Sequence, residues 1–251
     1  VEVFSGDKGL EEIASIKEAD LVVSSIVGIA GLYPTYKAIK TGHNVALANK
    51  ETLVAAGKII MDEANRNGVS ILPIDSEHSA IFQCLCGNDK KDVEKIILTA
   101  SGGPFRGKKY DYLKTVTSKM ALKHPNWVMG DKITIDSSTL MNKGFEVIEA
   151  KWLFGIDVDR IDVLVHPQSI IYSMVSYVDG VVMAQLGTKD MRIPISRAIM
   201  YPRREKNSFP KLDFLENNNL TFEKPDFSTF ECLKLAYDAI RVGGLTPAIL
   251  N

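Results

Sequence analysis

The stretch NVALANKETLVAAGKIIMDEANRNGVSILPID, residues 44–75, decides the fold. NVALAN is short and apolar, as in a buried strand, and ETLVAAGKIIMDEANRNG has helical spacing that ends at Gly68. VSILPID then predicts another strand. This order of strand, helix and strand is typical of a βαβ unit in a parallel sheet.

The residues before this stretch repeat the pattern. LEEIASIKEA is amphipathic, ADLVVSSIV is a continuous apolar run, and GLYPTYKAIKTG has helical spacing that closes at Gly42. We therefore expect residues 1–73 to form the second half of a doubly wound, Rossmann-like nucleotide-binding domain. Its first half would lie before Val1, and a helical pattern restarts just before Asn251, so the chain looks cut at both ends.

The pattern changes after residue 73. EKIILTASGG and DKITIDSS end in glycine- or serine-rich turns, and RIDVLVHP, SIIYSMVSY and VVMAQLG are strand candidates. Asp179-Gly180 separates the last two and is a strong hairpin signal. We expect an antiparallel sheet in an α+β catalytic, metal-binding domain over residues 74–207, a linker over 208–226, and the start of a helical domain over 227–251.

Composition excludes several classes of function. Lys and Arg total 30 against 31 Asp and Glu, so no net field draws the chain to nucleic acid or an anionic membrane. No apolar run approaches the roughly 18 residues of a transmembrane helix. The three cysteines are sparse and lack further ligands at finger-like spacing, which favours reduced thiols over a zinc site.

Two acids follow the strand that ends in ILPID. Asp75 and Glu77 are separated by one residue, so in extended backbone they point the same way, at the end of a strand where α/β proteins bind ligands. The alternative is that Asp75 or Ser76 caps the following helix and Glu77 favours its positive end. His78 lies beside the acids or simply lines the helix start.

A third acid lies in DSSTLMNKGFEVIEAKWLFG. Asn142, Lys143 and Glu146 share one helical face beside an apolar stripe. A solvated face with a Lys–Glu pair is the plain alternative. The residues from Asp136 to Thr139, including Ser137, precede the helix and would form a hydroxyl-rich phosphate cradle with the nearby lysine.

Three further segments carry weaker signals. ASGGPFRG, with Ser101, predicts a turn whose glycines let the main chain approach an anion, or an ordinary turn. LKHPNWVMGDK predicts either a lid or a corner packed by Trp127. Asn49, Lys50 and Glu51 follow a parallel strand, where Lys50 can donate to a substrate oxygen. Together the segments indicate a metal-assisted enzyme acting on a small phosphorylated substrate.

Several strings of this chain closely resemble the 1-deoxy-D-xylulose 5-phosphate reductoisomerase family. They are VGIAGLYPTYKAIKTG, LANKETLV, PIDSEHSAIFQ, ASGGPFR, KHPNWVMGDKITIDSSTLMNKGFEVIEA and HPQSIIYSMV. The resemblance implies an NADP-dependent oxidoreductase of non-mevalonate isoprenoid biosynthesis. It would isomerise and reduce 1-deoxy-D-xylulose 5-phosphate to 2-C-methyl-D-erythritol 4-phosphate with NADPH and Mg²⁺ or Mn²⁺, with Co²⁺ as a further option.

The resemblance also implies roles for individual residues. Metal ligands fall on Asp75, Glu77 and Glu146, and catalytic roles on Lys50, Glu77, His124 and Glu146. Cofactor contacts fall on Asn49, Glu51, Met129 and Gly130. Substrate contacts fall on Lys50, Ser76, Glu77, Ser101, His124, Trp127, Ser137, Asn142, Lys143 and Glu146.

The family's glycine-rich phosphate turn would lie before Val1, so we expect this chain alone to bind NADPH poorly. A homodimer and a location in the bacterial cytoplasm or a plastid-type organelle are further expectations from the family. Two alternatives stay open. One is a metal-dependent aldolase or isomerase for phosphosugars without hydride transfer, and the other is a catalytically silent product that only binds ligand or a partner subunit.

Overall fold

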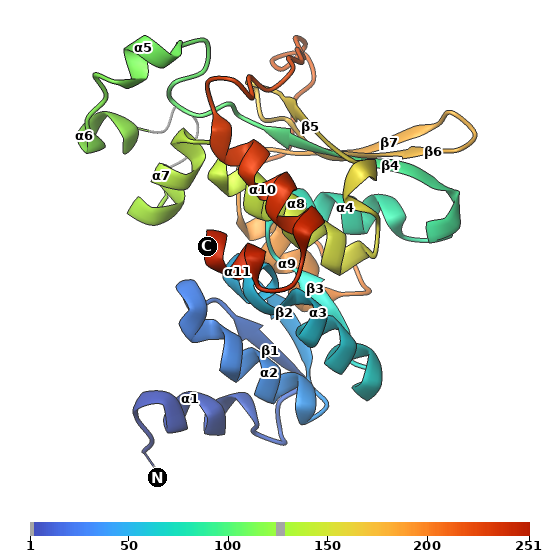
Figure 1. The fold of residues 1–251 in the computed structure, drawn as a ribbon. Coiled ribbons are helices and arrows are strands. Elements are labelled where there is room, and N and C mark those ends of the chain that lie inside the picture. The colour runs from blue at the N-terminus through green and yellow to red at the C-terminus, as the bar shows by residue number, and fades with distance from the viewer. Residues whose placement is uncertain (1–2, 124–128) are drawn as a thin grey trace.

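The computed structural model describes residues 3–123 and 129–251, and its chain forms two sheets with helices packed around and between them (Figure 1). The strands are β1 (Leu21–Ser24), β2 (Asn44–Leu47), β3 (Ile71–Pro73), β4 (Val93–Ala100), β5 (Ile161–Val165), β6 (Ile171–Tyr177) and β7 (Val182–Leu186). The helices are α1 (Gly6–Ala14), α2 (Leu32–Lys40), α3 (Lys50–Asn67), α4 (Ser76–Leu85), α5 (Tyr110–Leu113), α6 (Ser118–Ala121), α7 (Asp131–Ser138), α8 (Met141–Phe154), α9 (Arg192–Met200), α10 (Glu231–Val242) and α11 (Thr246–Leu250). Short 3-10 turns occupy Gly28–Gly31, Lys90–Asp92 and Val158–Arg160.

The first sheet has the order β1-β2-β3, and both strand pairs are parallel. Helix α2 connects β1 to β2, and α3 connects β2 to β3, which is the predicted βαβ arrangement. The Asn49 side chain caps α3 by accepting from Thr52 N at 2.8 Å, and Gly68 ends it in the left-handed conformation with a φ of 64°. The parallel part of the predicted α/β fold class is therefore confirmed.

The second sheet has the order β5-β4-β6-β7 and is mixed, where the sequence pattern predicted an antiparallel sheet. β6 pairs antiparallel with both β4 and β7, and Gly180 turns the β6–β7 hairpin with a φ of 87°. β5, however, runs parallel to β4. The antiparallel prediction is wrong for β5 because the long connection through α5 to α8 separates it from β4, and a crossover of that length permits parallel pairing.

A second difference concerns DKITIDSS. This segment forms helix α7, so Ser137 and Ser138 stand at the end of one helix and not in an open entry to the next. Ser137 Oγ donates to Ile133 O at 2.8 Å, and Ser138 Oγ donates to Ile135 O at 2.7 Å. Both hydroxyl groups therefore donate to backbone carbonyls of their own helix, as serine side chains often do.

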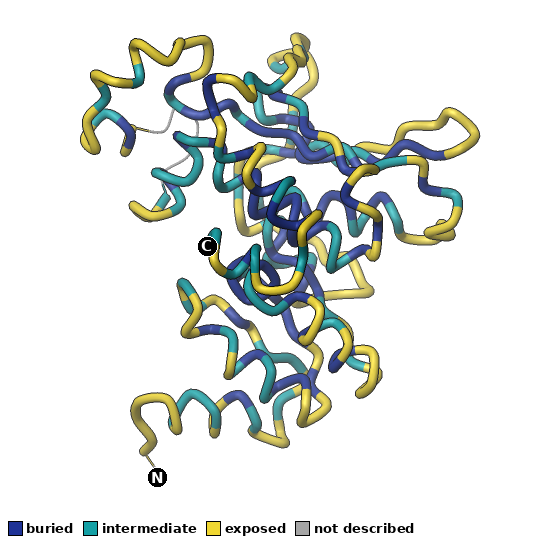
Figure 2. The backbone as a smooth tube through the Cα atoms, viewed as in Figure 1, coloured by how far each residue is buried: buried dark blue, intermediate teal, exposed yellow. Residues whose placement is uncertain are grey.

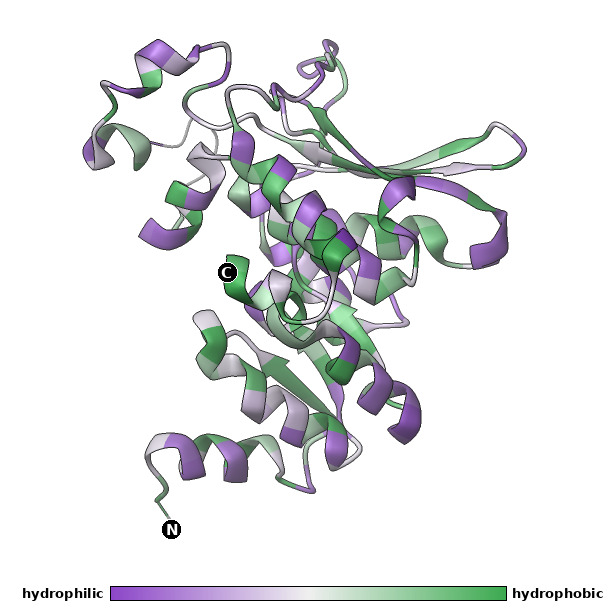
Figure 3. Ribbon diagram, viewed as in Figure 1, coloured by the Kyte–Doolittle hydropathy of each residue, from purple (hydrophilic) through white to green (hydrophobic). Residues whose placement is uncertain are grey.

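Helix α8 organises the main core. It packs on α3, α10 and α7, and with α4 it lies between the two sheets (Figure 1). Figure 2 shows the buried residues concentrated along these central elements. The hydropathy colours of Figure 3 show apolar strands β1 to β3 and a hydrophilic C-terminal end of α3. Phe145 and Ile148 of α8 join strand residues of the second sheet in one apolar cluster.

Residues 208–226 contain no helix or strand apart from an isolated bridge between Glu223 and Val165. Their role as a linker between domains, like the other domain boundaries, stays a prediction. Among the described residues, every helix is too short or too polar to cross a bilayer.

Candidate active site

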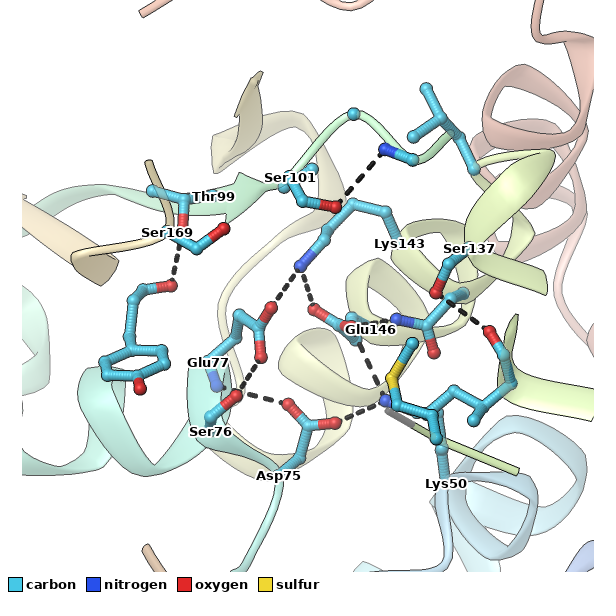
Figure 4. A pocket seen from close by; sticks show the side chains of 18 of the residues that line it. Lys50, Asp75, Ser76, Glu77, Thr99, Ser101, Ser137, Lys143, Glu146 and Ser169 are labelled. Carbon is cyan, nitrogen blue, oxygen red and sulfur yellow. Dashed lines mark hydrogen bonds and ion pairs between the residues drawn. The ribbon is translucent and has the colours of Figure 1, made fainter. Parts of the chain in front are cut away.

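A cavity of about 220 Å³ opens where the two sheets and α8 meet (Figure 4). Its walls come from the start of α3, the junction of β3 and α4, the end of β4, the junction of α7 and α8, and β6. It is lined by Lys50, Asp75, Ser76, Glu77, Thr99, Ala100, Ser101, Gly102, Gly103, Met129, Ile133, Ser137, Leu140, Asn142, Lys143, Glu146, Ser169, Ile171, Tyr172 and Met191.

Three carboxylates meet in this cavity. Asp75 and Glu77 flank the start of α4, and Glu146 comes from α8. One carboxylate oxygen of each lies within 4.8 Å of the others. Asp75 Oδ1 also accepts from Glu77 N at 3.2 Å, so Asp75 is the helix cap as well as a member of the acid group. The two interpretations of this residue are compatible.

Two lysines lie among these acids. Lys143 Nζ is 2.8 Å from Glu77 Oε1 and forms a second ion pair with Glu146 Oε2. Lys50 Nζ pairs with Asp75 and lies 3.5 Å from Glu146 Oε1. Lys143 is only 3% exposed and Glu146 only 1%, so the solvated-face alternative for this part of α8 is wrong. Buried charges of this kind need close partners to offset their lost hydration.

Burial and charge shift the pKa values of these groups in different directions. Burial would raise the pKa of Asp75, but the Lys50 ammonium and His78 hold it well below its usual range. Burial and the charge of Glu146 raise the pKa of Glu77 to about 7. Burial would lower the pKa values of Lys50 and Lys143, but the surrounding carboxylates raise both. Both lysines therefore stay cationic at neutral pH.

The hydroxyl and amide groups expected to hold a phosphate lie on the same cavity. Ser101, Ser137 and Asn142 line it together with Lys143. A Cβ on Gly103 would lie 2.6 Å from the Ser137 carbonyl oxygen, so only glycine lets the loop after β4 approach the end of α7 this closely. Asn142 Nδ2 donates to Glu146 Oε1 at 2.6 Å, which connects these groups to the acids.

Of the four expected cofactor residues, Met129 is the one that lines the cavity. Exposed Gly130 precedes α7. Asn49 is buried, and its Nδ2 donates to Gly28 O at 2.9 Å and Glu51 Oε2 at 3.1 Å. Glu51 Oε1 in turn pairs with Lys132 of α7 at 3.0 Å, which connects the start of α3 to α7. His124 and Trp127 lie outside the described residues.

Some residues of the site escaped sequence reasoning. Thr99, Ser169, Tyr172 and Met191 line the cavity but lie in strands or loops with no chemical motif. Ser169 has a φ of 52°, a backbone conformation that only the folded chain reveals. Glu149, one turn after Glu146, is buried, and burial raises its pKa to about 8. The sequence signal that could have pointed to Glu149 is its spacing of three residues from Glu146, which places both on one face of a helix.

A parallel nucleotide-binding-type sheet, a mixed sheet and a buried acid–lysine cavity between them define a two-sheet α/β protein built to hold a charged ligand. The chain belongs to the 1-deoxy-D-xylulose 5-phosphate reductoisomerase family. Three models of this family match the chain. The 1-deoxy-D-xylulose 5-phosphate reductoisomerase model matches residues 1–57, the model of its C-terminal domain matches residues 71–154, and a DXP reductoisomerase C-terminal domain model matches residues 186–251.

Relatives and solved structures agree on the family. The reductoisomerase of Ruminiclostridium cellulolyticum is 64% identical over 251 residues, which are 100% of this chain and 66% of the relative. That of Thermoanaerobacter sp. is 62% identical over 252 residues, again 100% of this chain and 66% of the relative. The chain thus spans 66% of the length of these curated relatives.

Two solved structures share the fold. The Zymomonas mobilis reductoisomerase in complex with NADPH has a TM-score of 0.91 and 46% identity, covering 97% of this chain and 63% of that one. A DOX-P reductoisomerase in complex with NADPH, fosmidomycin and magnesium has a TM-score of 0.91 and 47% identity, covering 95% and 61%.

Proposed function

We propose that the protein containing this chain converts 1-deoxy-D-xylulose 5-phosphate to 2-C-methyl-D-erythritol 4-phosphate, using NADPH and Mg²⁺ or Mn²⁺. The observation that carries the proposal is the group of Asp75, Glu77 and Glu146, whose oxygens lie within 4.8 Å of one another on a cavity beside two lysines. Support comes from relatives named for this activity and from related structures in complex with NADPH and magnesium.

The side chains fit a divalent cation. Carboxylate oxygens are the ligands that Mg²⁺ and Mn²⁺ prefer. Two ammonium groups already lie among these carboxylates, which shows that the position attracts positive charge. Asn142 Oδ1 is buried beside Glu146 without a hydrogen-bond partner among the described residues, so a further oxygen is available. Asp75, Glu77 and Glu146 would hold the ion, which would supply Lewis-acid polarisation of substrate oxygens.

The remaining groups would bind and orient the substrate. Ser101, Ser137, Asn142 and Lys143 would hold the phosphate, so binding energy far from the reacting carbons fixes their position. Lys50 would donate to a substrate oxygen near the acids. Met129 would lie against the nicotinamide, and Asn49, Glu51 and Gly130 would line the cofactor side. The substrate would also contact Ser76, Glu77, His124 and Trp127.

The experiment uses the full-length enzyme. NADPH oxidation is followed at its near-ultraviolet absorbance with substrate and Mg²⁺, and Mn²⁺ affinity is measured by electron paramagnetic resonance. Glu146→Gln should lose turnover and bind Mn²⁺ far more weakly while keeping its near-ultraviolet circular dichroism. Glu216→Gln, at an exposed position between β7 and α10, is the matched control and should match wild type.

The outcomes separate the alternatives. Substrate isomerisation or cleavage without oxidation of NADPH would support the hypothesis of an aldolase or isomerase and would overturn the proposed reductoisomerase activity. Binding of a phosphonohydroxamate without any turnover would support the hypothesis of a catalytically silent protein that only binds ligand. Normal activity and Mn²⁺ affinity in Glu146→Gln would remove the metal assignment.

We further propose a homodimer paired along β7. This strand is an edge of its sheet, and the hairpin exposes Val178, Val181, Val182 and Met183. An unpaired strand edge with an apolar row favours pairing with a second copy. Val182→Lys should shift the full-length enzyme from dimer to monomer in analytical ultracentrifugation, and an unchanged dimer would refute this interface.

Because the relatives come from bacteria, we also propose the bacterial cytoplasm as the location of the protein.

A further inference from the structure

Behind the cavity lies a buried acid that the proposed mechanism does not use. Glu149 is 3% exposed and follows Glu146 by one turn of α8, but it is absent from the residues that line the cavity. Its Oε2 has no hydrogen-bond partner among the described residues and lies 3.8 Å from His78 Nδ1. Burying an acid this deeply costs hydration free energy unless a close partner compensates for the lost water.

His78 lies between Glu149, the carboxylate of Asp75 and the backbone of Glu146. Its ring is 0% exposed, with Nε2 2.9 Å from the Glu146 carbonyl oxygen and Nδ1 3.3 Å from Asp75 Oδ1. A carbonyl oxygen only accepts, so Nε2–H donates to it. That bond fixes the ring and directs Nδ1 toward the carboxylates of Asp75 and Glu149. Phe154 stacks on the ring with centroids 6.2 Å apart and limits its rotation.

We propose that Glu149 is a positioning residue that acts through His78 to fix the Asp75 carboxylate for binding of the divalent cation. The inference rests on the proposed function. His78 Nδ1 forms no hydrogen bond among the described residues, so the ring contacts the carboxylates of Asp75 and Glu149 only at ion-pair distances of 3.3 and 3.8 Å. Groups that orient metal ligands in this way typically change metal affinity about 10- to 100-fold when they are removed.

A second ion bound by Asp75, His78 and Glu149 is the rival interpretation, because these donor atoms also lie within 4.8 Å of one another. Three observations favour the positioning role. His78 and Glu149 are buried away from the cavity, His78 Nε2 is already bonded to a carbonyl, and Asp75 itself lines the cavity with the other acids.

The test measures Mn²⁺ affinity and stoichiometry of the full-length enzyme by electron paramagnetic resonance, without turnover. Glu149→Gln keeps the shape of the side chain and removes the carboxyl group that faces His78, and we expect the Mn²⁺ Kd to rise about 10-fold or more. Glu149→Asp should recover part of the affinity. Glu63→Gln is the matched control, because Glu63 is another buried helical glutamate but pairs with Arg66 away from the cavity. Its Mn²⁺ Kd should equal that of wild type.

A double variant distinguishes positioning from a general loss of structure. If Glu149 acts through His78, adding Glu149→Gln to His78→Gln should change the Mn²⁺ Kd no further. Independent, multiplying losses would overturn the proposal, as would an unchanged Kd in Glu149→Gln. Two Mn²⁺ ions per subunit, one of them lost in Glu149→Gln, would establish the second-ion interpretation instead. Should Glu149→Gln fail to fold, Glu149→Asp takes its place in the cycle, and either wild-type affinity in Glu149→Asp or a loss that multiplies with that of His78→Gln would refute the role.

The proposed function fails by a different result. A wild-type enzyme that does not oxidise NADPH would overturn the reductase while leaving the Mn²⁺ measurements intact. Weakened Mn²⁺ binding in Glu149→Gln would then still support the positioning role.

Discussion

The contact between α8 and α10 makes a sharp prediction about Gly144. A Cβ at this position would lie 2.6 Å from Ala236 Cβ, with the backbone of Cys232 and Leu233 at 3.5 and 3.8 Å. Optimal carbon–carbon separations are about 3.5–4.0 Å, so the helices must part by roughly 1 Å to admit one methyl group. Neither Cβ can rotate away, because each is attached directly to its backbone.

Two effects of Gly144→Ala oppose each other. Alanine is favoured over glycine inside a helix by about 1 kcal/mol, whereas overpacking a core costs about 1–3 kcal/mol. We therefore expect a net loss of about 1 kcal/mol in the free energy of unfolding. Ala236→Gly removes the opposing methyl. In that background Gly144→Ala should become neutral or stabilising, with a coupling energy of about 1–3 kcal/mol between the two sites.

Chemical denaturation of the four proteins in this double-mutant cycle, followed by circular dichroism, measures the effect. The control is Gly155→Ala, at the left-handed cap after α8 with a φ of 65° and open space around it. It should destabilise through backbone strain alone and show no coupling to Ala236. A Gly144→Ala protein as stable as wild type, or additive effects in the cycle, would refute the close-packing argument.

Three further predictions follow from particular contacts. Gly57→Ala should destabilise the α3–α8 contact, since its Cβ would lie 2.2 Å from Trp152 Cδ1, and in a Trp152→Ala background Gly57→Ala should no longer lower the melting temperature. Thr99→Val should cost about 1–2 kcal/mol in denaturant because the buried hydroxyl has its one proton to donate between two carbonyl oxygens of β6, each 2.7 Å away, and a neutral effect would contradict this. Hydrogen bonds from Ser228 and other neighbours lower the pKa of Asp226 below its unfolded value, so its stabilisation is present above about pH 4 and is lost as pH falls. The difference in melting temperature between wild type and Asp226→Asn should therefore be full at pH 7 and narrow steadily as pH falls below about 4, whereas a constant gap would count against the hydrogen-bonded carboxylate.

Local patterns were sufficient for much of the fold. The helices and strands from residue 21 to residue 85 follow hydrophobic periodicity, and glycine ends α3 where expected. Helix α1 (Gly6–Ala14) covers only the first half of the amphipathic stretch LEEIASIKEA, residues 10–19. Asp179-Gly180 likewise predicted the hairpin between β6 and β7. These features depend on contacts between residues close in sequence, which periodicity and turn chemistry describe directly.

Other features depended on distant partners. The direction of β5 and the helical state of DKITIDSS were missed because strand pairing and packing against α8 override local signals. In the site, the choice between a surface ion pair and a buried one for Lys143 and Glu146 turned on burial, which spacing along a helix does not reveal.

The sequence by itself determined the alternation of strands and helices, the family and the chemical types available: carboxylates, lysines and hydroxyls. Only the tertiary structure decided that Lys50 and Glu146, 96 residues apart, would share one buried cavity, and that His78 and Glu149 would stand behind it. The physical reason is desolvation. The charge of a side chain is set by its residue type, but its energetic consequence depends on which distant groups exclude water around it.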